Sequence, residues 1–127
     1  MKIDDAEWFE LQFNPELALT KYGIALPSLP SDEVQLGFTA LSGRQNLLQA
    51  FSFYQYIQSA CGMGNVADPH ILDFGGGWGR ISRFFLKDTK PEHIYIAETM
   101  EYAISCLRTS GNACRVVHNQ PAPPSWA

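Results

Sequence analysis

The residues best suited to chemistry are one acid and a group of glycines in segment 70–83. Asp73 follows the apolar pair Ile71 and Leu72, and glycines come shortly after it at positions 75, 76, 77 and 79. Glycine lets the backbone approach a ligand closely, and the first N–H groups of a following helix lack partners. The pattern therefore predicts a buried parallel strand, a glycine loop that binds a ligand, and then a helix.

Three kinds of glycine loop compete for this segment. A phosphate-binding P-loop requires Lys and then Ser or Thr after its last glycine, and neither occurs at that spacing. A dinucleotide loop requires a third Gly or Ala, where this chain has Arg80 or Ser82. In the third kind an acid ends the strand, as Asp73 does here. Its carboxylate would repel a diphosphate but suits an ammonium group, and such a charged hydrogen bond contributes roughly 1.5–3 kcal/mol.

The later segments supply a second acid at the end of a second strand. Residues 93–97 predict a strand that ends at Glu98, and Thr99 is expected to cap a helix that stops before Gly111. Residues 114–118 predict a third strand. Strands and helices that alternate with short connections form a parallel sheet with right-handed crossovers, which is half of a doubly wound α/β fold.

These motifs resemble those of the class I S-adenosylmethionine-dependent methyltransferases. Segment 71–80 is similar to the first motif of that family and 94–98 to its second strand, and the resemblance covers about residues 70–118. The resemblance implies a Rossmann-like fold, S-adenosyl-L-methionine as cofactor, and methyl transfer to an acceptor that the sequence does not identify.

The resemblance also implies which residues bind the cofactor. Asp73 would order the polar end of the methionine part, Glu98 would accept hydrogen bonds from both ribose hydroxyls, and Met100 would lie near the adenine. Gly76 stands where relatives often have a small polar residue, a change that is not expected to disturb the turn. The implied cofactor-binding residues are Asp73, Gly75, Gly76, Gly77, Gly79, Glu98 and Met100. No catalytic residue follows from the resemblance.

The resemblance further implies that the fold is incomplete. The family's sheet has seven strands in the order 3-2-1-4-5-7-6, and the acceptor is usually bound after the fourth strand. This chain supplies only the first three strands, in the expected order 3-2-1, so the first strand becomes an edge. We therefore expect a truncated N-terminal half of a methyltransferase, inactive alone, whose open sheet edge favours self-association.

Residues 1–61 predict a series of helices ahead of the sheet. Asp4 or Asp5 can cap a first helix, Asn14 caps a second, and Ser31 can open one more turn. The longest helix is expected to start near Ser42. The helix from Ser42 carries one apolar stripe, formed by Leu47, Phe51, Tyr54, Ile57 and Cys61. We expect two units: a helical N-terminal cap over the cleft in 1–61, and the first half of a cofactor-binding domain in 62–127, ending in a proline-rich loop.

Composition and charge indicate which partners and which compartment to expect for this chain. The 127 residues are 46% apolar and 17% charged, and the net charge is −4 without a basic cluster, so a small-molecule acceptor is favoured over a nucleic acid. No apolar run is long enough for a membrane span and no signal peptide is apparent, which favours the cytoplasm. The three cysteines are expected to be reduced and partly buried. No metal site is expected, because His70, His93 and His118 lack ligand spacing with any Cys or acid.

Alternatives remain at this point. The chain could be a non-catalytic cofactor-binding or interaction module or, with less support, an NAD-dependent oxidoreductase. Asp73 could merely cap its loop, and Glu98 could be only an acid that favours the start of the next helix. Trp78 and Arg80 fit packing and surface roles better than catalysis.

Overall fold

The computed structural model describes residues 2–119, so the predicted proline-rich tail lies outside the described residues. Helices and strands follow in the order α1 (Asp5–Leu11), α2 (Pro15–Tyr22), α3 (Asp32–Thr39), α4 (Gly43–Ala60), β1 (Ile71–Phe74), β2 (Ile94–Glu98), α5 (Glu101–Thr109) and β3 (Arg115–His118). Three short 3-10 helices connect them: η1 (Met63–Asn65), η2 (Ser82–Lys87) and η3 (Pro91–His93). Within this part of the chain no helix is both long and apolar enough to cross a membrane.

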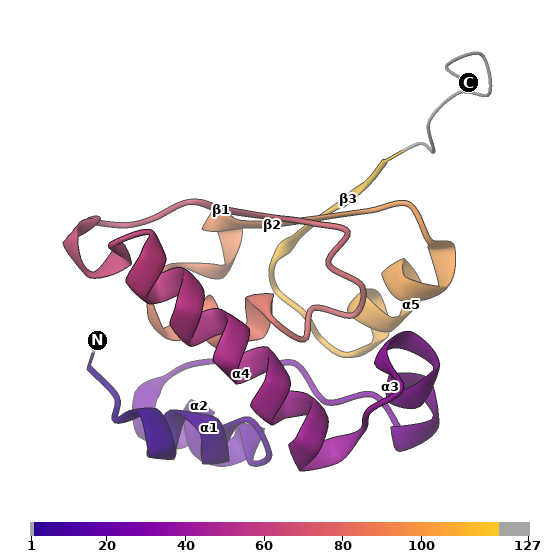
Figure 1. The fold of residues 1–127 in the computed structure, drawn as a ribbon, viewed down its shortest axis with the longest axis horizontal. Helices are drawn as coiled ribbons and strands as arrows, with labels where there is room; N and C mark the ends of the chain where they lie inside the picture. Colours follow the sequence, from indigo (N-terminus) through magenta and orange to yellow (C-terminus); the bar gives the residue numbers. More distant parts are fainter. Residues whose placement is uncertain (1, 120–127) are drawn as a thin grey trace.

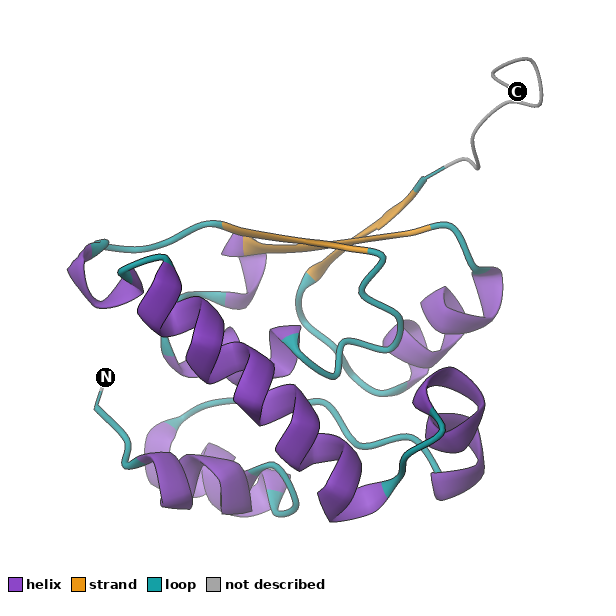
Figure 2. Ribbon diagram, viewed as in Figure 1, coloured by secondary structure: helices purple, strands orange, loops and turns teal. Residues whose placement is uncertain are grey.

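The three strands form one parallel sheet in the order β1-β2-β3, as expected. β1 lies at the edge of this sheet. The helices lie together beneath one face of the sheet in Figures 1 and 2. On the opposite face Leu72 and Phe74 are 66% and 75% exposed. The prediction that β1 is a buried strand is therefore wrong for one of its two faces.

The N-terminal helices begin where capping chemistry predicts. The side chains of Asp4, Asn14 and Ser31 each accept a hydrogen bond from a backbone N–H in the first turn. α2 ends at Gly23, whose φ of +69° is the left-handed conformation that glycine adopts without strain. Each side-chain cap stabilises its helix by about 1 kcal/mol, so these boundaries are local properties of the sequence.

The apolar stripe of α4 is real but shorter than predicted. Leu47, Phe51 and Tyr54 are buried, and Ile57 is partly buried against the same core. Cys61 is exposed and lies one residue beyond the end of the helix at Ala60. The expectation that Cys61 is partly buried is therefore wrong.

The segment after the glycine loop is a 3-10 helix and not the predicted α-helix. Every residue from Ser82 to Leu86 is buried, so this segment has no solvent-exposed face. The carbonyl oxygen of Phe84 accepts from Trp8 Nε1 at 3.0 Å, while the N–H of Asp88 donates to Phe85. A hydrogen bond from a residue 76 positions away thus takes the acceptor that an α-helix would use.

The helices and the sheet share one hydrophobic core. Trp8 of α1, Phe84 of η2 and Ile96 of β2 belong to a single cluster of buried side chains. Arg83 lies in this core with 1% of its surface exposed. The division into units 1–61 and 62–127 remains a prediction.

Candidate cofactor site

The glycine loop follows β1 at the carboxyl edge of the sheet. The N–H of Gly75 donates to the carbonyl of Ala97 at 2.7 Å, which fixes the start of the loop beside the end of β2. Gly75 and Gly77 have φ values of +70° and +59°, which other residues adopt only with strain. The residue types of this loop therefore follow from its backbone path.

A cavity of about 260 Å³ lies between the glycine loop and the end of α3. Four of the predicted site residues line it: Asp73, Gly75, Gly76 and Gly77. Phe38 and Thr39 of α3 form a further part of the wall, together with Trp78, Arg80 and Ile81. The cavity is therefore bounded by both the sheet and the N-terminal helices.

Two ionisable side chains line this cavity, the carboxylate of Asp73 and the guanidinium of Arg80. Burial raises the pKa of the Asp73 carboxyl above its usual value and the charge of Glu98 adds to this, whereas Ser82 and Arg80 act in the opposite direction. Burial also lowers the pKa of the Arg80 guanidinium, against the attraction of Asp73. A carboxylate that burial destabilises gains from any cationic ligand that reaches it.

Arg80 is held in place by the longest helix. Its Nη1 donates to Asn46 Oδ1 at 3.2 Å and to Gln49 Oε1 at 3.1 Å, both on α4. The guanidinium is thus positioned by neutral groups and keeps its charge available to the cavity.

Gly76 is the most tightly constrained residue of the loop. A Cβ at this position would lie 2.8 Å from Asp73 Oδ2 and 2.8 Å from Ile96 Cγ2. A side chain at position 76 would therefore clash with both neighbours, which agrees with the glycine found in this chain. The absence of a side chain keeps the Asp73 carboxylate where it faces the cavity.

Gly79 is buried beneath the loop. A Cβ there would lie 3.2 Å from both Asn112 Nδ2 and Leu107 Cδ2. Close packing against α5 and the turn that follows it thus accounts for this glycine. Its predicted contact with a cofactor remains a prediction.

Glu98 ends β2 on the same face of the sheet as Asp73. Its side chain is nearly buried and accepts a hydrogen bond from the N–H of Thr99 at 3.2 Å. The predicted cap at Thr99 is wrong, because Met100 is the residue that precedes α5 and it makes no side-chain cap. Part of the acceptor capacity of Glu98 is therefore used to hold its own turn.

A second cavity of about 420 Å³ lies next to Met100. Phe38 lines both cavities, and its ring stacks on that of Tyr102 with 6.0 Å between centroids and 7° between planes. The remaining lining residues are Glu33, Val34 and Gly37 of α3. An aromatic wall thus connects the glycine loop to the start of α5.

Sequence reasoning missed several of these residues. Phe38 and Tyr102 come from helices whose contact depends on the tertiary fold, so no local pattern in the sequence marks them. Trp78 and Arg80 stand inside the glycine motif, where packing and surface roles are expected, and both also line the cavity. The burial of Trp78 agrees with its packing role. Trp78 is only 3% exposed, and its Nε1–H is buried without a hydrogen-bond partner in the described residues.

A separate polar group lies at the opposite edge of the sheet. Asp68, His70 and His93 place their possible ligand atoms within 4.8 Å of one another. Spacing along the sequence does not reveal this group, because the register of the sheet is what brings His70 and His93 together beside Asp68.

Comparison with solved structures identifies the fold. The plantazolicin methyltransferase BamL, solved in complex with a triazolic desmethylPZN analog and SAH, matches 91% of this chain with a TM-score of 0.51 and 11% sequence identity. A putative RNA methyltransferase from Pyrococcus horikoshii matches 94% with a TM-score of 0.48 and 15% identity. No protein-family model and no curated protein sequence matches the chain.

The match covers nearly all of this chain but only part of each solved structure. The chain spans 40% of the length of BamL and 52% of the Pyrococcus protein. Together with the three parallel strands, the BamL match shows an incomplete Rossmann-like methyltransferase fold.

Proposed function

We propose that this chain binds S-adenosyl-L-methionine and supplies the cofactor-binding part of a methyltransferase. The observation that carries the proposal is a glycine loop that encloses a cavity together with Asp73, at the carboxyl end of β1. A second acid, Glu98, ends the neighbouring strand β2, although it lines neither of the two cavities. The shared fold adds support, since BamL was solved with SAH, the product that S-adenosylmethionine leaves after methyl transfer.

The glycine-loop cavity suits the amino-acid end of the cofactor. An ammonium group would neutralise Asp73, whose charge burial makes costly. A carboxylate would find the guanidinium of Arg80 as a donor in the same cavity. A zwitterion therefore fits this cavity better than a diphosphate, which Asp73 would repel.

The second cavity suits an aromatic base. Met100, Phe38 and Tyr102 offer one flexible apolar side chain and two stacked rings. Glu98 ends β2, two residues before Met100, and it has a second oxygen beyond the one that Thr99 occupies. We assign the ribose hydroxyls to Glu98 and the adenine to the surroundings of Met100.

The chemistry of the proposed enzyme is transfer of a methyl group from a sulfonium to a nucleophile. When bound, the cofactor supplies the activated methyl group, and the protein contributes mainly by holding donor and acceptor in line. Phe38 and Thr39 of α3 cover part of the glycine-loop cavity, so we propose that the N-terminal helices act as a cap. A small-molecule acceptor is proposed, since the net charge of −4 does not favour nucleic acid.

Calorimetric titration with S-adenosylmethionine tests the proposal. We expect saturable binding to the folded chain and none of comparable affinity with NAD. Glu98→Gln should weaken binding by about tenfold or more, since it removes a charged acceptor worth roughly 1.5–3 kcal/mol. Glu101→Gln, an exposed acid in the first turn of α5, is the matched control and should bind like the parent. Absence of saturable binding to a protein with native circular dichroism would contradict the proposal.

A further inference from the structure

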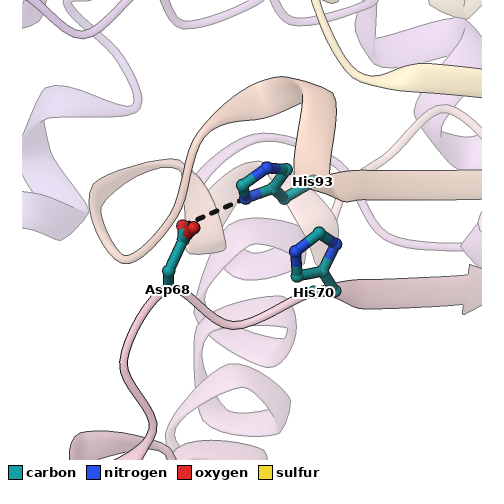
Figure 3. A group of neighbouring side chains, drawn as sticks. All are labelled: Asp68, His70 and His93. Atoms are coloured by element: carbon teal, nitrogen blue, oxygen red, sulfur yellow. Dashed lines mark hydrogen bonds and ion pairs between the residues drawn. The ribbon is translucent and has the colours of Figure 1, made fainter.

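The register of the sheet brings two histidines together at its amino edge. Ile71 of β1 pairs with Ile94 of β2, so the residues immediately before them, His70 and His93, are also neighbours. Their rings lie 3.9 Å apart between centroids and 21° from parallel (Figure 3). Adjacent parallel strands therefore fix two imidazoles side by side, although the histidines are far apart in the sequence.

Asp68 brings a carboxylate to the same place. Its Oδ1 lies 3.0 Å from Nδ1 of His93, as the dashed line in Figure 3 shows. Thr89 Oγ1 stands 3.4 Å from the same carboxylate oxygen and 3.5 Å from the same ring nitrogen. Asp68 also has a φ of +54°, a conformation that costs energy for a residue with a side chain. The backbone turn thus directs the carboxylate towards the histidines.

The three side chains form a set of metal ligands whose atom types favour some metal ions over others. Each offers one ligand atom, and these atoms all lie within 4.8 Å of one another. Imidazole nitrogens favour zinc and its neighbours in the transition series, whereas Mg²⁺ and Ca²⁺ prefer oxygen alone. Two nitrogens and one oxygen are a common set for Zn²⁺ with a further position left for water.

We propose that Asp68, His70 and His93 bind a divalent transition-metal ion of the zinc type. Coordination requires distances of about 2.0–2.2 Å from the metal, so the side chains must converge further than they do here. That adjustment is open to them, since His70 is exposed and the Asp68 side chain is 56% exposed. The hydrogen bond between Asp68 and His93 does not involve His70, whose approach to the pair adds a third ligand.

The metal site is separate from the proposed cofactor site. His70 and His93 precede their strands, whereas Asp73 and Glu98 lie at the opposite ends of the same strands. A bound ion would link the N-terminal ends of β1 and β2 and hold the two strands in register. We therefore assign it a stabilising role, and its test needs neither cofactor nor acceptor.

Zn²⁺ and Co²⁺ titrations of the full chain, free of other ligands, test this site. We expect binding of one ion per chain by calorimetry, visible absorption bands with Co²⁺, and a higher Tm in the presence of Zn²⁺, because a ligand of the folded state stabilises it. His70→Gln is the informative variant. The His70 side chain is exposed and has no hydrogen-bond partner among the described residues, so its replacement should not disturb folding. It should weaken Zn²⁺ binding by about tenfold or more while leaving the metal-free Tm unchanged.

His118→Gln is the matched control. His118 is exposed at the end of β3, away from the cluster, and its replacement should leave Zn²⁺ affinity as it was. His93→Gln should weaken binding like His70→Gln; if it alters folding, His70→Gln alone decides. The proposal is overturned if the folded parent binds neither ion, or if His70→Gln binds Zn²⁺ as tightly as the parent.

Discussion

Asp73 is the residue in which binding and stability are expected to oppose each other. Burial raises its pKa in the folded protein, so the folded state holds this proton more tightly than the unfolded chain does. The free energy of unfolding should therefore fall as the pH rises above the usual value of 3.8. The negative charge of Asp73, which a cationic ligand would bind, thus lowers the free energy of unfolding of the ligand-free protein.

Asp73→Asn should separate the two effects. We expect a higher Tm than the parent at pH 7, a difference that shrinks as the pH is lowered towards 3.8, and weaker binding of S-adenosylmethionine by about tenfold or more. Thermal unfolding across this pH range, followed by calorimetric titration at pH 7, measures both. A variant that is less stable than the parent at pH 7 would show that Asp73 is held by favourable contacts and not strained by burial.

Gly76→Ala should damage the site by steric means alone. The added methyl group meets the Asp73 carboxylate and Ile96 at 2.8 Å, so we expect a loss of about 1–3 kcal/mol in unfolding free energy together with weaker cofactor binding. Gly64→Ala is the matched control, because its Cβ would meet nothing within 4 Å. Equal stability of the two variants in denaturant titrations would rule out the close contact at Gly76.

At the scale of elements, the sequence predicts those helix starts that depend only on neighbouring residues. The caps at Asp4, Asn14 and Ser31 form because a side chain and a backbone N–H three residues away need nothing else. The hydrogen bond from Trp8 to the Phe84 carbonyl of η2 and the stacking of Phe38 on Tyr102 in the site depend on the tertiary fold. Both are contacts between distant segments, which periodicity does not reveal.

The candidate site divides in the same way. Asp73 and three of the glycines line the cavity as the motif predicted, because a strand followed by glycines specifies its own path. Arg80 was assigned to the surface, since no local pattern shows that Asn46 and Gln49 of α4 hold it against the loop. The cluster of Asp68 with two histidines was missed because it requires the register of the sheet.

Two phenylalanines offer a direct test of how the elements pack. Phe84 is fully buried against Phe51 and Tyr54, with ring centroids 5.1 and 5.7 Å away, so Phe84→Ala should cost about 3–5 kcal/mol. Phe74 is 75% exposed, and Phe74→Ala should change the unfolding free energy by about 0.5 kcal/mol or less. Urea unfolding of both variants measures the contrast, and comparable losses would mean that the outer face of β1 is covered in solution.

At the scale of the whole molecule, the edge position of β1 is the main exposed feature. Among residues 2–119 its only strand partner is β2, and the exposed Leu72 and Phe74 lie on the sheet face that the described helices leave open. Unpaired strand edges pair readily with other chains. The predicted self-association through this edge therefore remains our expectation.

Sedimentation at increasing protein concentration tests that expectation. Leu72→Lys places a charge on β1 and should shift the parent's self-association towards monomer, because lysine on an edge strand disfavours pairing. Val66→Lys, at a 50% exposed residue outside the sheet, is the matched control. Association that persists unchanged in Leu72→Lys would assign the contact to another surface.

Arg83 has a consequence for how the molecule opens. Its Nε donates to Gln12 Oε1 at 2.9 Å and its Nη2 donates to the Pro27 carbonyl at 2.6 Å. One side chain of η2 thus binds two separate parts of the N-terminal region. If the helices detached from the sheet, this guanidinium would lose both acceptors. The amides of α1 and β2 should then exchange with deuterated solvent in a single cooperative event, and ordering of the glycine loop by a ligand should slow exchange in helices that the ligand never touches.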